Sequence, residues 1–374
     1  MDFSFVFPCL NEEESLGFCV KELRKSLEDS NCKYEIILAD NGSTDNSVEI
    51  AEELGCRVVN IRNKGYGAAL KGGIETANGE YVIFADCDGS YPLKDTLKLY
   101  QKTFSEEADL GIASRLNGKI EHGAMPVLHK YLGTPVLTFL INILFGGNLS
   151  DCNSGFRCVK KSTFKTWNIR ANGMEFASEM LIKSLKSYSK IVEVPSGLRK
   201  DIRKRPPHLS TWRDGMRHLL FILSEKPKIM EVPGFALIIL TSIFQIVALL
   251  SGPSKIMETN VFDYHTHALL LMAGIIGAQL YLLSCFIYLA GVDSPLQITR
   301  KILEMDEAFL FFLLTSVMTA SFLAVLFIVF VWASRNFGNL SVINPFLVML
   351  HFISISGFLS IGLLGIHIFK KAMK

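Results

Sequence analysis

Four long apolar stretches in the C-terminal part of the sequence constrain the fold most. They cover residues 233–250, 267–290, 309–333 and 345–369, and a bilayer is crossed by a helix of about 17–25 mainly apolar residues. Helices buried in a soluble domain would show polar faces at helical spacing, and these stretches have almost none. We therefore predict an all-α domain of four transmembrane helices over residues 233–374.

Charged residues divide the chain near Val232. Of the 38 Lys/Arg and 36 Asp/Glu residues, only seven and six lie beyond this point, so the first 232 residues have the charge density of a soluble domain. The basic residues between and after the stretches are Lys255 in the first loop, Arg300 and Lys301 in the second, Arg335 in the third, and Lys370, Lys371 and Lys374 in the tail. This distribution predicts that both termini, and hence the N-terminal domain, are cytoplasmic.

Other classes of protein are disfavoured by composition. The net charge is +2, and apart from one short segment, residues 199–218, no basic tract interleaved with aromatic residues indicates a nucleic-acid partner. The eight cysteines form no CxxC pair, which favours reduced thiols over disulfides or a zinc site. The first residues lack the basic and apolar regions of a signal peptide. A homo-oligomer is compatible with the sequence.

The first 86 residues alternate β-rich runs with helical patterns. The predicted strands are residues 2–8, 34–40, 57–60 and 81–86, and the predicted helices are residues 13–29, 47–54 and 68–76. This alternation predicts an α/β domain with a mostly parallel sheet, whose ligand site lies at the carboxyl ends of the strands.

Polar loops follow three of these strands. They read PCLNE from Pro8, DNGSTD from Asp40 and DCDG from Asp86. Each alone fits a turn, a capped helix or a solvated loop, but together they fall at one edge of the sheet. The NKGYG segment after the third strand lacks the GxGxxG pattern of a dinucleotide site.

The DCDG loop indicates a specific chemistry. Two carboxylates one residue apart can address one Mg²⁺ or Mn²⁺ ion, which takes one or two carboxylates together with substrate phosphate oxygens. Such a metal neutralises a departing diphosphate. The loop therefore predicts a nucleotide-diphosphate donor.

These motifs resemble those of a known family. PCLNEEES, ADNGSTDNS, NKGYGAALKGGIETANGEY and FADCDGSYP, in this order, are similar to an inverting family 2 glycosyltransferase with the GT-A fold. The following stretch, from IASRLNGK to DCNSGFRCVKK, resembles the polyprenyl-phosphate sugar transferases, a group that includes dolichol-phosphate mannose and glucose synthases. The resemblance covers residues 3–225.

The resemblance implies roles for individual residues. Pro8, Asn11, Glu12 and Asp40 would line the base and ribose pocket, Asn41, Lys64 and Gly65 would lie beside the nucleotide, Asp86 and Asp88 would hold the metal and diphosphate, and Arg115 would contact phosphate. Asp88 is also the nearest candidate for a base. Asn41 stands where many relatives have a second Asp, and Gly89-Ser90 follows the DxD where others have Leu-Gln.

Two segments are candidates for handling the acceptor. Residues 125–145 are interrupted by Gly133 and Pro135 and are too short to span a bilayer, which fits an interfacial helix pair or a buried helix of the soluble domain. Residues 199–218 hold the dense basic cluster, and residues 211–223 have the mixed faces of an in-plane helix. The predicted ligands of an acceptor phosphate are Lys130, Arg157, Arg203 and Arg205, with a structural ion pair as the alternative for Arg157.

The sequence thus predicts a catalytic domain over residues 1–198, a juxtamembrane segment over 199–232 and a transmembrane domain over 233–374. The predicted function is metal-dependent transfer of a sugar, with inversion, from a nucleotide-diphosphate sugar to a membrane polyprenyl phosphate. The alternatives are a processive polysaccharide synthase, which would carry a QxxRW motif where this chain has Thr211-Trp212-Arg213, and a non-catalytic transport or flippase accessory protein.

Overall fold

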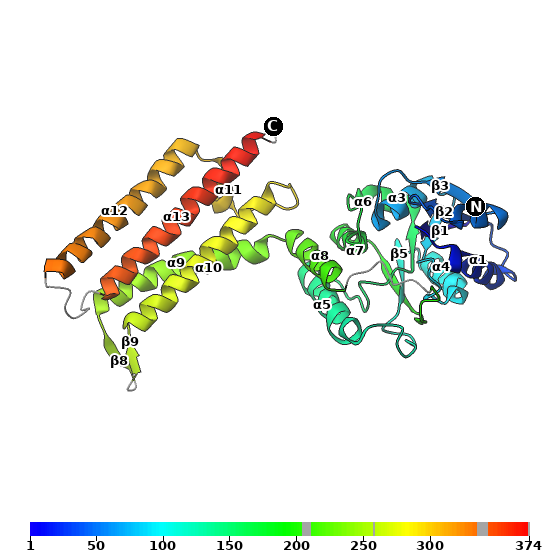
Figure 1. Ribbon diagram of the computed structural model, residues 1–374, viewed down its shortest axis with the longest axis horizontal. Coiled ribbons are helices and arrows are strands. Elements are labelled where there is room, and N and C mark those ends of the chain that lie inside the picture. Colours follow the sequence, from blue (N-terminus) through cyan, green and yellow to red (C-terminus); the bar gives the residue numbers. More distant parts are fainter. Residues whose placement is uncertain (204–210, 257–258, 335–342, 373–374) are drawn as a thin grey trace. The chain divides into compact units, whose positions relative to one another are not determined.

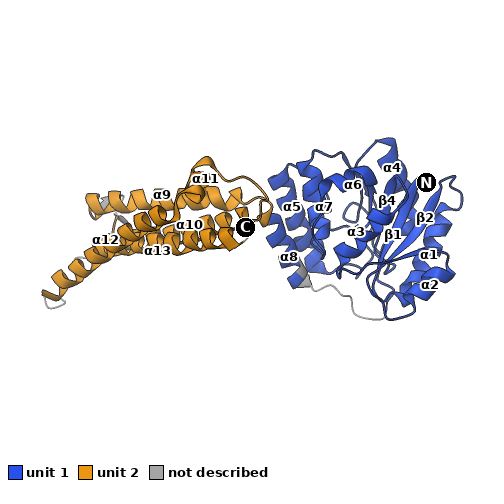
Figure 2. Ribbon diagram, turned by 90° about the horizontal axis from the view of Figure 1, so that it is seen from above, with its two compact units in different colours: residues 1–222 blue, residues 223–374 orange. Residues whose placement is uncertain are grey.

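A computed structural model describes residues 1–203, 211–256, 259–334 and 343–372 (Figure 1). The chain divides into two compact units, residues 1–222 and residues 223–374 (Figure 2). The predicted juxtamembrane segment, residues 199–232, is divided between the end of the first unit and the start of the second. Arg205 lies outside the described residues.

The first unit is built on a seven-stranded mixed sheet. In spatial order its strands are β3 (Arg57–Asn60), β2 (Tyr34–Asp40), β1 (Phe3–Cys9), β4 (Tyr81–Phe84), β6 (Arg157–Lys160), β5 (Leu110–Ser114) and β7 (Ile191–Pro195). The first four are parallel, β6 is antiparallel to both of its neighbours, and β5 and β7 are again parallel. The predicted α/β class with a mostly parallel sheet is confirmed.

Helices cover both faces of this sheet. They are α1 (Glu13–Leu27), α2 (Ser47–Glu53), α3 (Tyr66–Thr76), α4 (Thr96–Ser105), α5 (Thr134–Phe145), α6 (Lys161–Trp167), α7 (Phe176–Lys186) and α8 (Thr211–Ser224), which ends just past the unit boundary. Because side chains alternate along a strand, Phe5 packs with α1 in one core and Val6 packs with α3 in the other. Each large apolar side chain buried in this way stabilises the fold by about 1.5–3 kcal/mol.

Five of the seven elements predicted over the first 86 residues begin or end one or two residues away from the predicted bounds, and two of these differences concern predicted site residues. The strand predicted over residues 81–86 ends at Phe84, so that Asp86 already belongs to the loop. The helix predicted from Ala68 begins at Tyr66, directly after Gly65.

The second unit is a helical bundle with a short hairpin. Its helices are α9 (Lys228–Ser251), α10 (Tyr264–Tyr288), α11 (Gln297–Glu304), α12 (Glu307–Ser334) and α13 (Ile343–Ala372), and the hairpin pairs β8 (Ser254–Ile256) with β9 (Thr259–Val261). Helix α10 packs against both α9 and α13. Its crossing with α9 is close, because a Cβ at Gly277 would lie 2.7 Å from the Cβ of Leu237. Small residues commonly allow such contacts between membrane helices.

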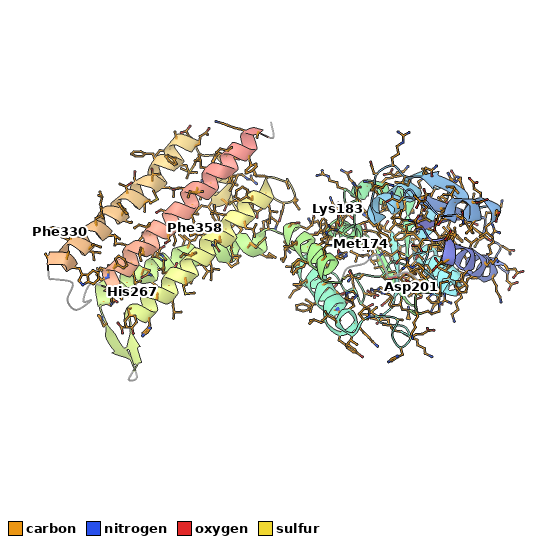
Figure 3. The ribbon with its side chains drawn as sticks, in the orientation of Figure 1. Met174, Lys183, Asp201, His267, Phe330 and Phe358 are labelled. Atoms are coloured by element: carbon orange, nitrogen blue, oxygen red, sulfur yellow. The ribbon has the colours of Figure 1, made fainter. Side chains whose placement is uncertain are left out.

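Four of these helices, α9, α10, α12 and α13, are long and apolar enough to cross a membrane, which confirms the four predicted spans. Helix α12 exposes large apolar side chains along its length. Phe312 and Phe330 are 71% and 70% exposed, and Phe330 extends outward from this helix (Figure 3). Exposed aromatic side chains over the whole length of a helix suit contact with lipid.

Candidate active site

Three loops meet at one edge of the sheet in the first unit. They follow β1, β2 and β4, which are neighbouring parallel strands, so the carboxyl ends of these strands lie side by side. Hydrogen bonds join the first two loops. The Asn11 backbone N–H donates to Ser43 Oγ (2.9 Å), the Glu12 N–H donates to Ser47 Oγ (2.7 Å), and Asn11 Oδ1 accepts from the Thr44 N–H (2.7 Å).

Asp40 stabilises the second loop through hydrogen bonds to its backbone. This side chain is 5% exposed, and its carboxylate accepts from the backbone N–H groups of Gly42 and Ser43, each at 3.0 Å. Pro8 is one residue before the end of β1, where it pairs in register with Ala39 of β2. The residues predicted for the base and ribose pocket therefore belong to one hydrogen-bonded framework.

Asn41 connects this framework to the segment that precedes α3. Its amide nitrogen donates to the carbonyls of Ile61 and Asn63, and its amide oxygen accepts from the Gly65 N–H at 2.7 Å. A carboxylate has no N–H to donate, which explains why Asn stands here rather than a second Asp. Lys64 Nζ donates to the Asn41 carbonyl at 2.6 Å.

Gly65 is required by the close approach of another loop. It has a φ of +125°, and a Cβ at this position would lie 2.1 Å from the carbonyl oxygen of Asn172. Only glycine combines this backbone conformation with this contact. Any substitution would displace the start of α3 from the second loop.

The DxD loop carries the two predicted metal ligands. Asp86 Oδ1 accepts from the Tyr66 hydroxyl at 2.7 Å, and Asp88 Oδ1 accepts from the Ser90 N–H at 2.9 Å. Burial, with the neighbouring charge of Asp88, raises the pKa of Asp86 from 3.8 to about 6. Gly155 borders this site, because a Cβ there would lie 2.7 Å from Asp86 Oδ2.

The DxD pair fits a divalent cation that arrives with phosphate. Each carboxylate accepts a hydrogen bond through Oδ1, and Asp88 Oδ2 lies 3.3 Å from Arg203 Nη2. Among the residues that the structure describes, no group of three or more His, Cys, Asp or Glu side chains suited to a metal ion occurs. Mg²⁺ and Mn²⁺ need only one or two carboxylates when substrate phosphates and waters complete the coordination.

The structure places the predicted phosphate-binding arginines differently. Arg115 forms a two-pronged ion pair with Asp151, in which Nε and Nη2 each donate to a carboxylate oxygen at 2.8 Å. Arg157 is 1% exposed, and its guanidinium donates to the carbonyls of Cys152, Ser154 and Ala177. Arg157 therefore holds its own loop, and these contacts correspond neither to a phosphate ligand nor to an ion pair.

Arg203 lies beside two of the loops that the sequence assigns to the nucleotide-sugar donor. Its Nη1 lies 2.8 Å from Glu12 Oε1, and its Nη2 lies 3.3 Å from Asp88 Oδ2. The sequence predicted contact with an acceptor phosphate, because Arg203 lies in the basic stretch next to the membrane domain. Tertiary contacts bring Arg203 to carboxylates of the loops after β1 and β4, and its contact with an acceptor phosphate stays a prediction.

Lys130 lies apart from these loops, on the π-helical turn (His129–Gly133) that leads into α5. Its ammonium group is 5.3 Å from the ring centroid of Tyr131. Exposed apolar side chains surround it on the same helical stretch: Val127, Leu128, Tyr131, Leu132, Val136, Phe139 and Ile143. Their spacing of three or four residues makes one continuous outward face, whereas Leu137 and Ile141 pack into the core.

Sequence reasoning missed two contributors to the site, Tyr66 and Tyr91, and it placed Asp151 in the segment that returns to the site without its partner Arg115. Tyr66 binds Asp86, and Tyr91 Oη accepts from the Gly155 N–H at 2.7 Å. The available signal was position, since Tyr66 starts α3 and Tyr91 follows the DxD loop within three residues. The pairing of Asp151 with Arg115 gave no such signal, because the two residues lie 36 positions apart.

Comparison with known proteins identifies the family. Residues 4–167 match the model of glycosyl transferase family 2. The low-salt glycan biosynthesis hexosyltransferase Agl6 of Haloferax volcanii is 35% identical over 288 residues, which cover 76% of this chain and 67% of Agl6. The chain belongs to glycosyltransferase family 2.

Other family 2 relatives align with the catalytic part. The UDP-N-acetylglucosamine–dolichyl-phosphate N-acetylglucosaminyltransferase of Methanococcus voltae is 30% identical, with 51% of this chain and 82% of that protein aligned. The dolichol-phosphate mannosyltransferase of Pyrococcus furiosus is 28% identical, with 52% and 56% aligned. A crystal structure of a mycobacterial protein shares the fold at a TM-score of 0.50 and 21% identity, with 60% of this chain and 74% of that chain covered. This family 2 protein is therefore a glycosyltransferase with a GT-A-type fold.

Proposed function

We propose that this glycosyltransferase transfers a hexose from a nucleoside-diphosphate sugar to a membrane polyprenyl phosphate, with inversion at the anomeric carbon. The observation that carries the donor half is the meeting of the three loops after β1, β2 and β4, with Asp86 and Asp88 at their centre. Relatives that act on dolichyl or dolichol phosphate support the acceptor half. The four membrane-length helices support an acceptor held in lipid.

Asp86 and Asp88 would hold the divalent cation. A cation bound there neutralises charge on the departing nucleoside diphosphate. Tyr66 and the Ser90 N–H orient the two carboxylates through the hydrogen bonds described above. The loops after β1 and β2, fixed to each other by Asn11, Ser43 and Asn41, would bind the nucleoside and exclude water from it.

The acceptor needs little activation. The second pKa of a phosphate monoester is about 6, so a polyprenyl phosphate is largely ionised at pH 7 and its oxygen can attack without a strong protein base. The task of the enzyme is then to align this oxygen with the anomeric carbon, opposite the leaving diphosphate. Asp88 was the candidate for a catalytic base, and we assign it to the metal.

Transfer is expected to depend on pH through Asp86. Its pKa of about 6 means that the carboxylate is about 90% ionised at pH 7 and about 10% ionised at pH 5. Only the ionised form attracts the cation, so the apparent affinity for Mn²⁺ should fall about tenfold between pH 7 and pH 5, and kcat/KM should fall at least as much because the acceptor phosphate is protonated over the same range. Raising the Mn²⁺ concentration should move the midpoint to lower pH, because cation binding favours ionisation. A flat kcat/KM profile over this range would contradict the role of Asp86.

The outward apolar face of residues 127–143 is proposed to lie in the headgroup region of the bilayer. A soluble surface seldom exposes so many contiguous apolar side chains. Helix α8 lies beside α5 in both views (Figures 1 and 2) and exposes Met216 and Leu220. Amphipathic helices that lie in the interface plane combine such apolar faces with basic residues, here Lys130 and Arg213.

Charging this face should impair use of the lipid acceptor. We expect Phe139→Glu to raise the KM for a long-chain polyprenyl phosphate in vesicles by about tenfold, because a side chain that is 61% exposed would lose its burial in lipid. Kinetics with a short-chain acceptor in detergent should change little. Ser105→Glu, an equal charge change on exposed α4, is the matched control. Equal KM values for Phe139→Glu and Ser105→Glu in vesicles would refute this placement.

The topology proposal is that the first unit and the tail after α13 share the cytoplasmic side. It rests on the distribution of basic residues. In cells carrying a Cys32→Ser background, we expect a cysteine at Ser254, between α9 and α10, to react with an impermeant maleimide from outside. A cysteine at Ser105 should react only after permeabilisation. The opposite pattern of labelling would show that the orientation is inverted.

The transfer itself can be tested directly. Full-length protein in detergent is incubated with a short polyprenyl phosphate, Mn²⁺ and radiolabelled UDP-glucose, UDP-N-acetylglucosamine or GDP-mannose in turn. We expect one donor to give a label that partitions into organic solvent as a lipid-linked monosaccharide. A polymer that stays in the aqueous phase would favour a processive synthase, and no product with any donor would favour an accessory protein.

A further inference from the structure

A short segment that follows β7 lies along the DxD loop. We call residues 198–203 the strap. The Arg199 N–H donates to the carbonyl of Ser90 at 2.8 Å, and the Ile202 N–H donates to the carbonyl of Asp88 at 3.1 Å. A Cβ at Gly89, whose φ is +76°, would lie 2.9 Å from Ile202 Cδ1. The strap therefore binds the backbone of the DxD loop on both sides of Gly89, at Asp88 and at Ser90.

Arg203 at the end of the strap places a positive charge among carboxylates of three segments. Besides Glu12 and Asp88, its guanidinium contacts Asp201, with Nε 2.9 Å from Asp201 Oδ2. Asp201 lies on the strap itself (Figure 3). The Arg203 side chain is 9% exposed, so this cation is shielded from water and its influence on nearby charges is strong.

The contacts of Arg203 with its three carboxylate partners differ in length. The shortest contacts with Glu12 and Asp201 are 2.8 and 2.5 Å, whereas the contact with Asp88 is 3.3 Å. Asp88 can therefore exchange its contact with Arg203 for another cation while Arg203 stays held by the other two carboxylates. This exchange requires only a side-chain movement and leaves the strap on the loop.

We propose that Arg203 is a resident counterion of Asp88 that competes with the divalent cation, so that the cation binds tightly only together with the donor diphosphate. The proposal rests on the proposed function in taking a divalent cation and a nucleoside diphosphate as ligands. A fixed positive charge beside Asp88 opposes a second cation until phosphate charge arrives to offset it. Cation and nucleotide then strengthen each other's binding by the same factor, since binding coupling is reciprocal.

The test measures cation binding rather than catalysis. Mn²⁺ is titrated into full-length protein in detergent and followed by electron paramagnetic resonance, without nucleotide and with UDP or GDP. For the wild type we expect weak Mn²⁺ binding alone and much tighter binding with one nucleotide. Arg203→Gln should bind Mn²⁺ at least tenfold more tightly without nucleotide, and the enhancement by nucleotide should shrink. Arg203→Lys keeps the charge and should behave like the wild type.

Arg199→Gln is the matched control on the same strap. Arg199 pairs with Glu22 and donates to the carbonyl of Tyr91, away from the DxD carboxylates, so its loss should leave Mn²⁺ affinity unchanged. Equal Mn²⁺ affinity in wild type and Arg203→Gln overturns the proposal for Arg203 but leaves the proposed function intact. It is also overturned if Arg203→Gln loses only metal-free nucleotide binding, which would make Arg203 a diphosphate ligand. If no variant binds Mn²⁺ with either nucleotide, the proposed metal dependence fails as well.

Discussion

Asp88→Asn is expected to lower the rate of sugar transfer by about 1,000-fold or more at saturating donor and Mn²⁺. A metal ion that offsets charge on a leaving diphosphate contributes several kcal/mol to the transition state, and about 4 kcal/mol corresponds to a factor of 1,000. Asn retains the acceptor for the Ser90 N–H, so the loop should keep its conformation. Initial rates with radiolabelled donor measure the effect.

Two measurements separate this loss from misfolding. The thermal transition of the Asp88→Asn protein in detergent should stay close to that of the wild type, and its Mn²⁺ binding should disappear. Asp109→Asn is a suitable control, because Asp109 binds the Thr163 hydroxyl and the Lys190 N–H directly before β5, outside the three loops of the site. Transfer by Asp88→Asn at the wild-type rate would remove Asp88 from the metal site.

Asp151→Ala is expected to destabilise the first unit by about 3–5 kcal/mol. The Asp151 side chain is fully buried and Arg115 is 12% exposed, so the substitution leaves a guanidinium without its counterion in the interior. The ion pair lowers the pKa of Asp151 against the opposing effect of burial. For a domain of this size the loss corresponds to roughly 6–20 °C in Tm.

The prediction is checked by thermal unfolding of the full-length protein in detergent. Glu106→Ala removes the exposed partner of Lys102 and Lys190 on the surface, where solvent screens ion pairs, and its Tm should match that of the wild type. Asp151→Asn retains shape and one acceptor, so its Tm should lie between the two. An unchanged Tm for Asp151→Ala would mean that Arg115 finds another partner.

Much of the fold was predictable, because its elements carry strong local patterns. The spans 233–250, 309–333 and 345–369 lie within α9, α12 and α13, and the second span overruns α10 by two residues. The strands at residues 34–40 and 57–60 have the predicted bounds. The strands β5, β6 and β7, which lie beyond the first 86 residues, were not predicted.

The donor side of the site was predictable for a related reason. Parallel neighbouring strands bring their carboxyl ends together, so polar residues after β1, β2 and β4 had to meet once the sheet was inferred. The side chains that Arg203 contacts could not be predicted from the sequence. Arg203 lies 115 residues from Asp88 and 191 from Glu12, and its place in the sequence, next to the membrane domain, pointed to the acceptor.

The sequence by itself determined the class of each half of this protein and the residue types of its donor site, because apolar length and strand-end loops act locally. Only the tertiary structure decided how the arginines are used. Arg157 holds backbone carbonyls, Arg115 is paired with Asp151, and Arg203 lies on Asp88. A long cationic side chain can reach many partners, and which one it binds depends on which carboxylates and carbonyls the folded backbone leaves within its reach and shields from water.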